Sequence, residues 1–409
     1  MKCRHCGSQK LSPVIDLGSS PPSNAYLSKS DLNKLEKWFP LKVNVCNECF
    51  LVQTEDYSNA DELFDGNYAY FSSFSQTMLD HSKNYVDDMV KRFGLNVDTM
   101  VIEIAANDGY LLQFFKRKGV PCLGIEPTKS TADAARSKGI EIVEEFFGVE
   151  SAEKLARKGF SADLMVSNNV LAHVPNINDF VKAYCILLKP DGVATFEFPY
   201  LISLFEHHQF DTIYHEHFSY LSLTAVEKIF KSNGLRIFDV EKINTHGGSL
   251  RVFAERQDSS HKKCQSKMVS ELINREKSDG YLSERTYTKL QGAAEKAKDD
   301  LLKFLINAKE KDKSVYAYGA AAKGNTFINF SGIRSDLISA VADNNPNKQG
   351  KFMPGSRIPI VSKEVLASNK PDYVVILPWN LKEEIISDLN YMREWGCRFV
   401  VGIPKLEVL

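Results

Sequence analysis

The chain has 409 residues, a hydrophobic fraction of 43% and a formal net charge of -1. This length exceeds one typical core, so we expect an α/β protein of two or three domains. Basic and acidic residues are interleaved, which argues against nucleic acid or an anionic membrane as partner and favours a small-molecule substrate. The sequence shows neither an apolar signal core nor a membrane span, so we expect a cytoplasmic protein, and a monomer because several domains can bury their own surfaces.

Two C-x-x-C pairs, Cys3 with Cys6 and Cys46 with Cys49, lie on either side of a segment rich in Pro, Ser and Asn. Four thiolates complete the tetrahedral sphere of zinc and leave no open position for catalysis. We therefore expect a structural zinc in a small domain over residues 1–75. A redox pair is the alternative, but the segment lacks the βαβ pattern of thioredoxin-like motifs.

An aromatic, serine-rich stretch follows over residues 64–81. Tyr68 and Tyr70 share a face if the chain is extended, and with Ser72 they are candidates for binding a sugar or nucleotide. A plain aromatic core would use the same residues.

The stretch VIEIAANDGYLLQFFKRKGVPCLGIEP over residues 101–127 predicts a buried strand, a tight turn, a helix over 110–118 and a second strand over 122–125. Such a unit favours a doubly wound sheet, here expected in residues 76–256, with its ligand at the carboxyl ends of the strands. A dinucleotide fold is the alternative, but no G-x-G-x-x-G follows the first strand. S-adenosylmethionine is the expected cofactor, and its candidate ligands are Glu103, Ala105, Asn107, Asp108, Gly109, Glu126 and Pro127.

Further strands are expected over residues 163–167 and 193–198, consistent with the same sheet. Asn168 and Asn169 follow the first of these, where they could contact the adenine or methionine portion of the cofactor. Either residue could instead cap the next helix.

A charged, mostly helical stretch over residues 256–313 leads into a second strand-turn-helix pattern, so we expect a Rossmann-like domain within residues 257–409. Further strands are expected over 337–342, ending before Asp343, and over 373–377. The turn Gly319 to Gly324 offers small residues and Lys323 at a helix N-terminus, which suits a phosphate group. It does not match a Walker A sequence, so nucleotide hydrolysis is not expected.

Four ionisable side chains stand together at Tyr214, His215, Glu216 and His217. A histidine removes protons readily near neutral pH, and a neighbouring Tyr or Glu can orient it or stabilise a developing oxyanion. A metal site is less well supported, because H-E-H lacks the helical spacing of H-E-x-x-H. The remaining interpretation is that these histidines are ordinary surface or core residues with no catalytic role.

Over nearly its whole length the chain resembles the nucleotide-sugar C-methyltransferases, which methylate a carbon of a 4-keto-deoxysugar. The motifs that carry the resemblance are the cysteine quartet, PPSNAYL, VIEIAANDGYLL, NNVLAHVP, FEFPYL, YHEHFSYLS, HGGSLRVFAER, YGAAAKGNTFINF and VADNNPNKQGKFMPG.

The resemblance implies methyl transfer from S-adenosylmethionine to the C-3 carbon of a nucleoside-diphosphate 4-keto-6-deoxysugar through an enolate. His217 is the implied base, supported by Tyr214 and Glu216, and the implied substrate-binding residues are His173, His246, Lys323 and Asn325. An O- or N-methyltransferase remains the alternative, and the sequence does not identify the nucleobase or the C-3 substituent.

Overall fold

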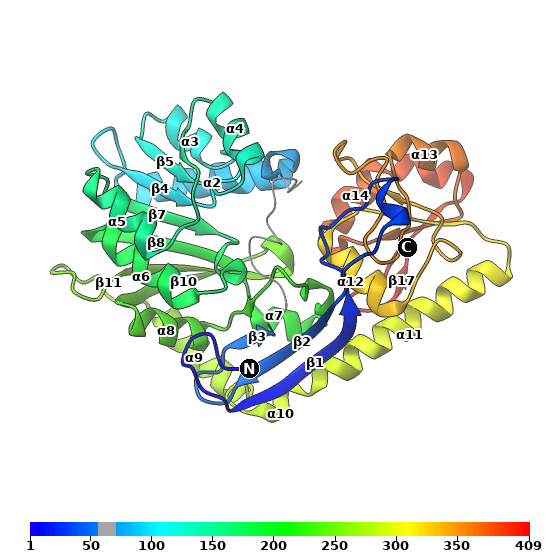
Figure 1. Ribbon diagram of the computed structural model, residues 1–409, viewed down its shortest axis with the longest axis horizontal. Coiled ribbons are helices and arrows are strands. Elements are labelled where there is room, and N and C mark those ends of the chain that lie inside the picture. The colour runs from blue at the N-terminus through cyan, green and yellow to red at the C-terminus, as the bar shows by residue number, and fades with distance from the viewer. Residues whose placement is uncertain (56–70) are drawn as a thin grey trace.

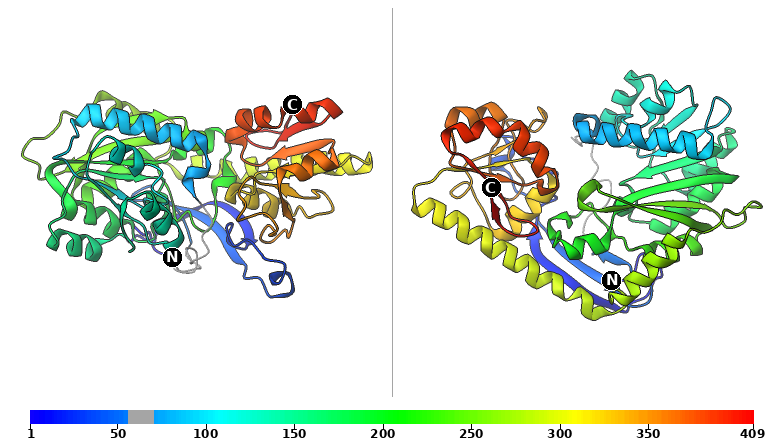
Figure 2. Two further views of the ribbon diagram at one scale, coloured as in Figure 1. Left: turned by 90° about the horizontal axis from the view of Figure 1, so that it is seen from above. Right: turned by 180° about the vertical axis from the view of Figure 1, so that it is seen from behind.

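Three sheets organise residues 1–55 and 71–409, the part of the chain that the computed structural model describes. A central and a C-terminal α/β unit stand apart in Figure 1, and strands β1 and β2 and the long helix α11 run beneath both. The views from above and behind in Figure 2 show the same arrangement, with α11 reaching from one unit to the other. Strands β1 and β2 and helix α11 therefore connect the two units and hold them in this arrangement.

The N-terminal sheet is antiparallel in the order β1-β2-β3-β9. Alternate residues of β2, namely Leu41, Val43 and Val45, are buried, as the period of a strand with one covered face requires. Its strands are β1 (Leu11–Ser20), β2 (Phe39–Cys46), β3 (Val52–Thr54) and β9 (Ser219–Tyr220). The last of these comes from the middle of the chain, so the N-terminal sheet is completed by a strand of the central unit.

The central sheet has the order β10-β11-β8-β7-β4-β5-β6, with a parallel part over β8 to β6 and an antiparallel edge at β11 and β10. Strand β4 is buried at every position, because helices cover both faces of such a sheet. The strands are β4 (Val101–Ile104), β5 (Cys122–Ile125), β6 (Glu141–Val143), β7 (Ala162–Asn168), β8 (Leu188–Pro199), β10 (Leu235–Ile243) and β11 (Ser249–Arg256). The helices are α2 (Gln76–Phe93), α3 (Leu112–Arg117), α4 (Lys129–Ser137), α5 (Val149–Arg157), α6 (Ile177–Leu187), α7 (Leu201–Glu206) and α8 (Leu223–Ser232).

Short 3-10 turns connect several of these elements. They are η1 (Asp31–Asn33), η2 (Ser72–Phe74), η3 (Leu171–His173), η4 (Phe210–Thr212), η5 (Thr245–Gly247), η6 (Trp379–Leu381) and η7 (Asn390–Trp395). Helix α3 begins at Leu112, two residues later than expected, because the chain is still in the turn at Tyr110 and Leu111.

The C-terminal sheet has the order β14-β13-β12-β15-β16-β17 and is parallel except for β17. Its strands are β12 (Val315–Tyr318), β13 (Val341–Ala342), β14 (Ile360–Val361), β15 (Tyr373–Ile376), β16 (Arg398–Val401) and β17 (Glu407–Val408), and its helices are α12 (Ala322–Ser331), α13 (Lys363–Asn369) and α14 (Lys382–Asp388). The strand expected over 337–342 was too long, because Leu337 and Ile338 both bond back to the Arg334 carbonyl in a turn.

The charged connector is helical, as expected, and forms α9 (Lys267–Ser278), α10 (Glu284–Tyr287) and α11 (Lys289–Glu310). Leu301 and Leu305 of α11 are fully buried one helical turn apart, so this helix packs along a single stripe. Within residues 1–55 and 71–409, no helix has the length and apolar character needed to cross a bilayer.

Candidate active site

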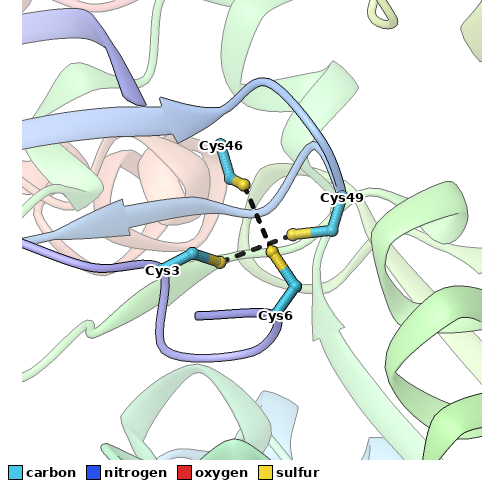
Figure 3. Close-up of side chains that lie close together, drawn as sticks. All are labelled: Cys3, Cys6, Cys46 and Cys49. Carbon is cyan, nitrogen blue, oxygen red and sulfur yellow. Dashed lines mark hydrogen bonds between the residues drawn. The ribbon is translucent and has the colours of Figure 1, made fainter. Parts of the chain in front are cut away.

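The two C-x-x-C pairs meet in one cluster beside the N-terminal sheet. The sulfurs of Cys3 and Cys49 lie 3.5 Å apart, those of Cys6 and Cys46 lie 3.5 Å apart, and all four lie within 4.8 Å of one another (Figure 3). Tetrahedral zinc with bonds of about 2.3 Å separates its sulfurs by about 3.8 Å, so the cluster fits the ion. The four thiolates fill its coordination sphere, which makes the zinc structural.

The turn after β4 is bent into an unusual backbone conformation. Ala105, Asn107 and Gly109 have φ of 54°, 50° and 73°, a region that side chains disfavour. A Cβ on Gly109 would lie 2.4 Å from the Ile140 side chain, so only glycine fits there. The turn therefore brings backbone rather than side chains to the carboxyl end of β4, as a close-lying cofactor requires.

Glu126, at the end of β5, holds this turn in place. Its Oε2 accepts the Asn107 N–H at 2.9 Å, and its Oε1 accepts the Thr128 N–H at 2.9 Å and the Thr131 hydroxyl at 3.1 Å. Burial raises the pKa of Glu126, while these donors lower it. Glu103 is buried beneath the turn, and its pKa lies well above the usual range because of burial and then the charges of Glu126 and Asp108.

Asn168 ends β7 and Asn169 follows it, at the same edge of the sheet. Asn169 has a φ of 58°, and its N–H donates to the Glu197 carbonyl at 2.7 Å. The side-chain oxygens of both residues are buried without a hydrogen-bond partner among the described residues. Buried amide oxygens call for a donor, so the amino groups of S-adenosylmethionine fit this edge.

The other predicted cofactor residues lie around the turn. Pro127 is half-buried directly after Glu126. Asp108 accepts Lys138 Nζ through its carbonyl at 2.6 Å and its carboxylate at 3.3 Å. Ser72, predicted to bind substrate, donates its N–H to Asn107 Oδ1 at 3.0 Å and so lies against the cofactor turn.

Tyr214 to His217 form a tight turn closed by the His217 N–H on the Tyr214 carbonyl at 2.9 Å. His217 Nδ1 lies 2.7 Å from the Thr212 carbonyl, which can only accept, so Nδ1 carries the proton. In the neutral ring Nε2 then holds the lone pair, and the Tyr214 hydroxyl donates to it at 2.6 Å. The turn therefore presents a histidine in the tautomer of a base.

Burial keeps His217 neutral. Its pKa is lowered well below the usual value, first by burial and then by the charge of His173. The His173 ring packs edge-on against it with centroids 4.6 Å apart, and the Tyr214 ring lies at 3.9 Å with its plane tilted by 32°. Because His173 lies in η3, soon after Asn168 and Asn169, the predicted base is close in the fold to the predicted cofactor edge.

Glu216 and His215 point elsewhere. Glu216 is buried and accepts Asn24 Nδ2 at 2.6 Å, and burial raises its pKa to about 7. His215 Nε2 faces the carbonyls of Phe39 and Pro40 at 3.3 and 3.2 Å, in the N-terminal unit. Tyr214 and His217 therefore face each other, while His215 and Glu216 contact residues of the N-terminal unit.

His246 and Lys323 belong to the same electrostatic environment as His217. His246 has a φ of 55°, its Nε2 is buried without a partner among the described residues, and its pKa is lowered to about 4 by burial and then by Lys323. Lys323, in the first turn of α12, donates to Asn380 Oδ1 at 3.1 Å, and burial lowers its pKa. The central and C-terminal units therefore both contribute to this site.

Three more residues were predicted to bind substrate: Tyr68, Tyr70 and Asn325. Tyr68 and Tyr70 lie outside the described residues. Asn325 is fully buried in α12, and its amide donates to the Ser23 carbonyl at 2.6 Å, so it joins the C-terminal unit to the N-terminal segment.

The structure adds Asp211 and Trp379, which were not predicted as site residues. The Trp379 indole donates to Asp211 Oδ2 at 2.8 Å, and the Lys323 ammonium lies 4.9 Å from the indole centroid. A Cβ on Gly247 would lie 2.4 Å from the same indole. Trp379 therefore packs between two loops of the central unit, a contact that no local sequence signal indicates.

Comparisons with family models divide the chain into three parts, much as the three sheets do. Three family models match consecutive parts of the chain: a zinc binding domain over residues 3–64, a methyltransferase domain over 78–240 and a C-methyltransferase C-terminal domain over 244–404. A ubiquinone biosynthesis O-methyltransferase of Bartonella tribocorum is 26% identical over 97 residues, which is 23% of this chain and 38% of that protein. Magnesium protoporphyrin IX methyltransferase of Synechocystis, a solved structure with bound SAM, has 16% identity and a TM-score of 0.33 over 44% of this chain and 82% of its own.

The central sheet, the cysteine cluster and the matched domains together define an S-adenosylmethionine-dependent methyltransferase with a structural zinc. The C-methyltransferase NovU of Streptomyces niveus is 36% identical over 408 residues, covering 100% of this chain and 96% of that protein. The chain belongs to this C-methyltransferase family.

Proposed function

We propose that the protein methylates the C-3 carbon of a nucleoside-diphosphate 4-keto-6-deoxysugar, with His217 as the base. The observation that carries the proposal is the pair of contacts on the His217 ring, which place the proton on Nδ1 and the lone pair on Nε2. A hydrogen beside a ketone is acidic because the resulting carbanion delocalises onto oxygen. A neutral, buried imidazole is well suited to remove it.

The reaction needs few groups beyond this base. S-adenosylmethionine, held at the turn of Asn107 and Glu126, supplies an electrophilic methyl group on a positively charged sulfur. His217 Nε2 would take the proton from the substrate carbon, whose electron pair then forms the new bond to the methyl group as the sulfur–methyl bond breaks and neutral S-adenosylhomocysteine leaves. The proton stays on His217, where the Thr212 carbonyl stabilises the imidazolium through Nδ1, until solvent removes it.

Tyr214 supports the same step. Its hydroxyl donates to Nε2, so Nε2 can accept the substrate proton once this hydroxyl turns away. The released hydroxyl can then donate to the 4-keto oxygen as negative charge develops there.

The sugar would lie between the central and C-terminal units. His173 and His246 supply neutral imidazoles, since the pKa of each is lowered to about 4. Lys323 supplies a positive charge at the N-terminus of α12, which suits the diphosphate. The three domains, over residues 1–75, 76–256 and 257–409, would thus hold zinc, the methyl donor and the nucleotide sugar in turn.

The test combines methyl transfer and proton exchange. Thymidine-, guanosine- and cytidine-diphosphate 4-keto-6-deoxysugars are incubated with the protein and methyl-labelled cofactor, and the product is located by NMR. We expect a new C-3 methyl group with one nucleotide sugar, and wash-in of deuterium at C-3 in D2O. A label found on oxygen or nitrogen, without exchange at C-3, would show an O- or N-methyltransferase instead.

A further inference from the structure

The N-terminal segment between β1 and β2 crosses to the catalytic turn. There the Asn24 amide donates to Glu216 Oε2 at 2.6 Å, across 192 positions of sequence. Glu216 is buried, and Asn24 is the side chain that donates to its carboxylate in the described part of the chain. We propose that Asn24 is a positioning residue of this site, which acts through Glu216 to fix the turn that carries His217.

The catalytic turn is held by several contacts: His215 faces the carbonyls of Phe39 and Pro40, Thr54 donates its hydroxyl to the His217 carbonyl at 3.3 Å, and two more contacts reach the turn from other units. Thr326 of α12 donates its hydroxyl to the Ile213 carbonyl at 2.8 Å, immediately before Tyr214. Asn24 holds Glu216, immediately before His217. One contact comes from the C-terminal unit and the other from the N-terminal segment, so each end of the turn has its own anchor.

Asn24 itself is positioned by the C-terminal unit. Tyr26 donates its hydroxyl to the Ala320 carbonyl at 2.6 Å and lies 3.4 Å from Asn24 Oδ1. The Ser23 carbonyl accepts the Asn325 amide, and Leu27 exchanges backbone hydrogen bonds with Phe352 at 3.0 and 2.8 Å. These contacts keep the segment in place without the Asn24 side chain, so its removal should leave the fold intact.

A hydrogen bond from a neutral amide to a carboxylate favours the ionised form. The side chain and the backbone N–H of Asn24 therefore favour the ionised form of Glu216, against burial, which raises the pKa of Glu216 to about 7. Two neighbouring groups do not titrate between pH 6 and 9, because burial raises the pKa of Tyr26 above its usual value and lowers the pKa of His173 to about 4.

The test compares Asn24→Ala with Asn44→Ala in the full-length, zinc-loaded protein. Asn44 also donates its amide to a glutamate, Glu55, at 3.0 Å, but this bond starts from β2 and does not involve the residues of the catalytic turn. We expect Asn24→Ala to lower kcat at least roughly 10-fold, the loss of one charge-assisted hydrogen bond, with the Kd for S-adenosylmethionine and the zinc content unchanged. Asn44→Ala should keep kcat. A kcat within twofold of the wild type, or a loss of cofactor affinity in parallel with kcat, would overturn the role of Asn24.

Asn24→Asp provides a second readout. Two carboxyl groups this close cannot both be ionised, but a protonated one can donate to the other. The activity of Asn24→Asp relative to wild type should therefore rise as the pH falls from 8.5 to 6. A purely structural defect predicts a ratio that does not change with pH, and that result would also count against the proposal.

The inference rests on the proposed function only for its kinetic readouts. Carbon-13 NMR of the Glu216 carboxyl, assigned with Glu216→Gln, follows its titration without any substrate. Asn24→Ala should raise the pKa of Glu216, and an unchanged pKa refutes the contact. Wild-type protein that methylates none of the 4-keto sugars would refute the proposed function alone, while the titration still decides on Asn24.

Discussion

Both α/β units place an acidic residue at the end of their second strand, and in both its carboxylate accepts a backbone N–H of the turn after the first strand. Glu126 accepts from Asn107 at 2.9 Å, and Asp343 accepts from Ala320 at 2.7 Å. Around the first turn, the amide oxygens of Asn168 and Asn169 have no partner within the described chain. The shared pattern builds the turn in both units.

In the second turn, the chain itself bonds the Ala320 carbonyl, while Lys323 of the following helix lies beside Trp379 and Asn380. The Ala320 carbonyl accepts the Tyr26 hydroxyl at 2.6 Å and Lys348 Nζ at 2.8 Å, and the lysine lies 5.1 Å from the Tyr26 ring centroid. Tyr26 comes from the N-terminal segment. The comparison teaches that a strand, a turn and a helix, with an acidic residue after the next strand, define the fold of the turn. Residues far away in the sequence decide which groups of that turn remain available to a ligand.

The zinc site should support the second turn more than the first, because Tyr26 follows directly on the zinc-bearing sheet. We expect Cys46→Ser to lose its zinc and to melt at least about 5 °C lower. Metal analysis and calorimetry measure this, with the exposed Cys264→Ser as control. A metal-free variant with wild-type stability and activity would contradict a structural role for the ion.

The lone pair assigned to His217 Nε2 predicts a large kinetic effect. His217→Ala should lose turnover by roughly 100-fold or more, the usual consequence of removing a general base, while cofactor binding stays normal. Steady-state kinetics and calorimetric titration with S-adenosylhomocysteine separate the two. The exposed His261 serves as the control position, and near-normal turnover of His217→Ala would exclude it as the base.

Equivalent substitutions of the two acids test the comparison directly. Glu126→Ala should weaken the Kd for S-adenosylmethionine roughly 10- to 100-fold, since it removes charge-assisted hydrogen bonds that hold the open turn. Asp343→Ala should leave this Kd within twofold. If both variants lose affinity equally, the two turns do not differ in the way we infer.

The smallest effect is expected at the turn after β12, where Tyr26 bonds the Ala320 carbonyl. Tyr26→Phe removes one hydroxyl from the Ala320 carbonyl, which should cost about 1 kcal/mol of stability and leave the Kd for S-adenosylmethionine unchanged. Denaturant unfolding followed by fluorescence measures the change, with Tyr391→Phe at an exposed position as control. A weaker cofactor Kd in Tyr26→Phe would mean that the two turns are coupled.

Local patterns predicted much of this molecule. The strand over 122–125, the small-residue turn before α12 and the cysteine cluster were all readable, because each depends on neighbours in sequence or on a metal's fixed ligand spacing. The proposed role of Asn24 could not be predicted from the sequence, because its partner Glu216 is 192 positions away and only the fold brings the two together. The expected strand over 337–342 failed for a similar reason: its apolar residues suit a strand, but the chain turns at Arg334.

Strand β9 joins Ser219 and Tyr220, two residues beyond His217, to β3 of the N-terminal sheet. The protein is therefore not a row of exchangeable modules. A chimera that takes its N-terminal unit from a relative must also match the β9 edge and the Ser23 to Tyr26 segment. The Ser23 to Tyr26 segment contacts the central unit through Glu216 and the C-terminal unit through Ala320 and Asn325. Replacing the C-terminal unit to alter specificity should therefore succeed only when this segment is replaced with it.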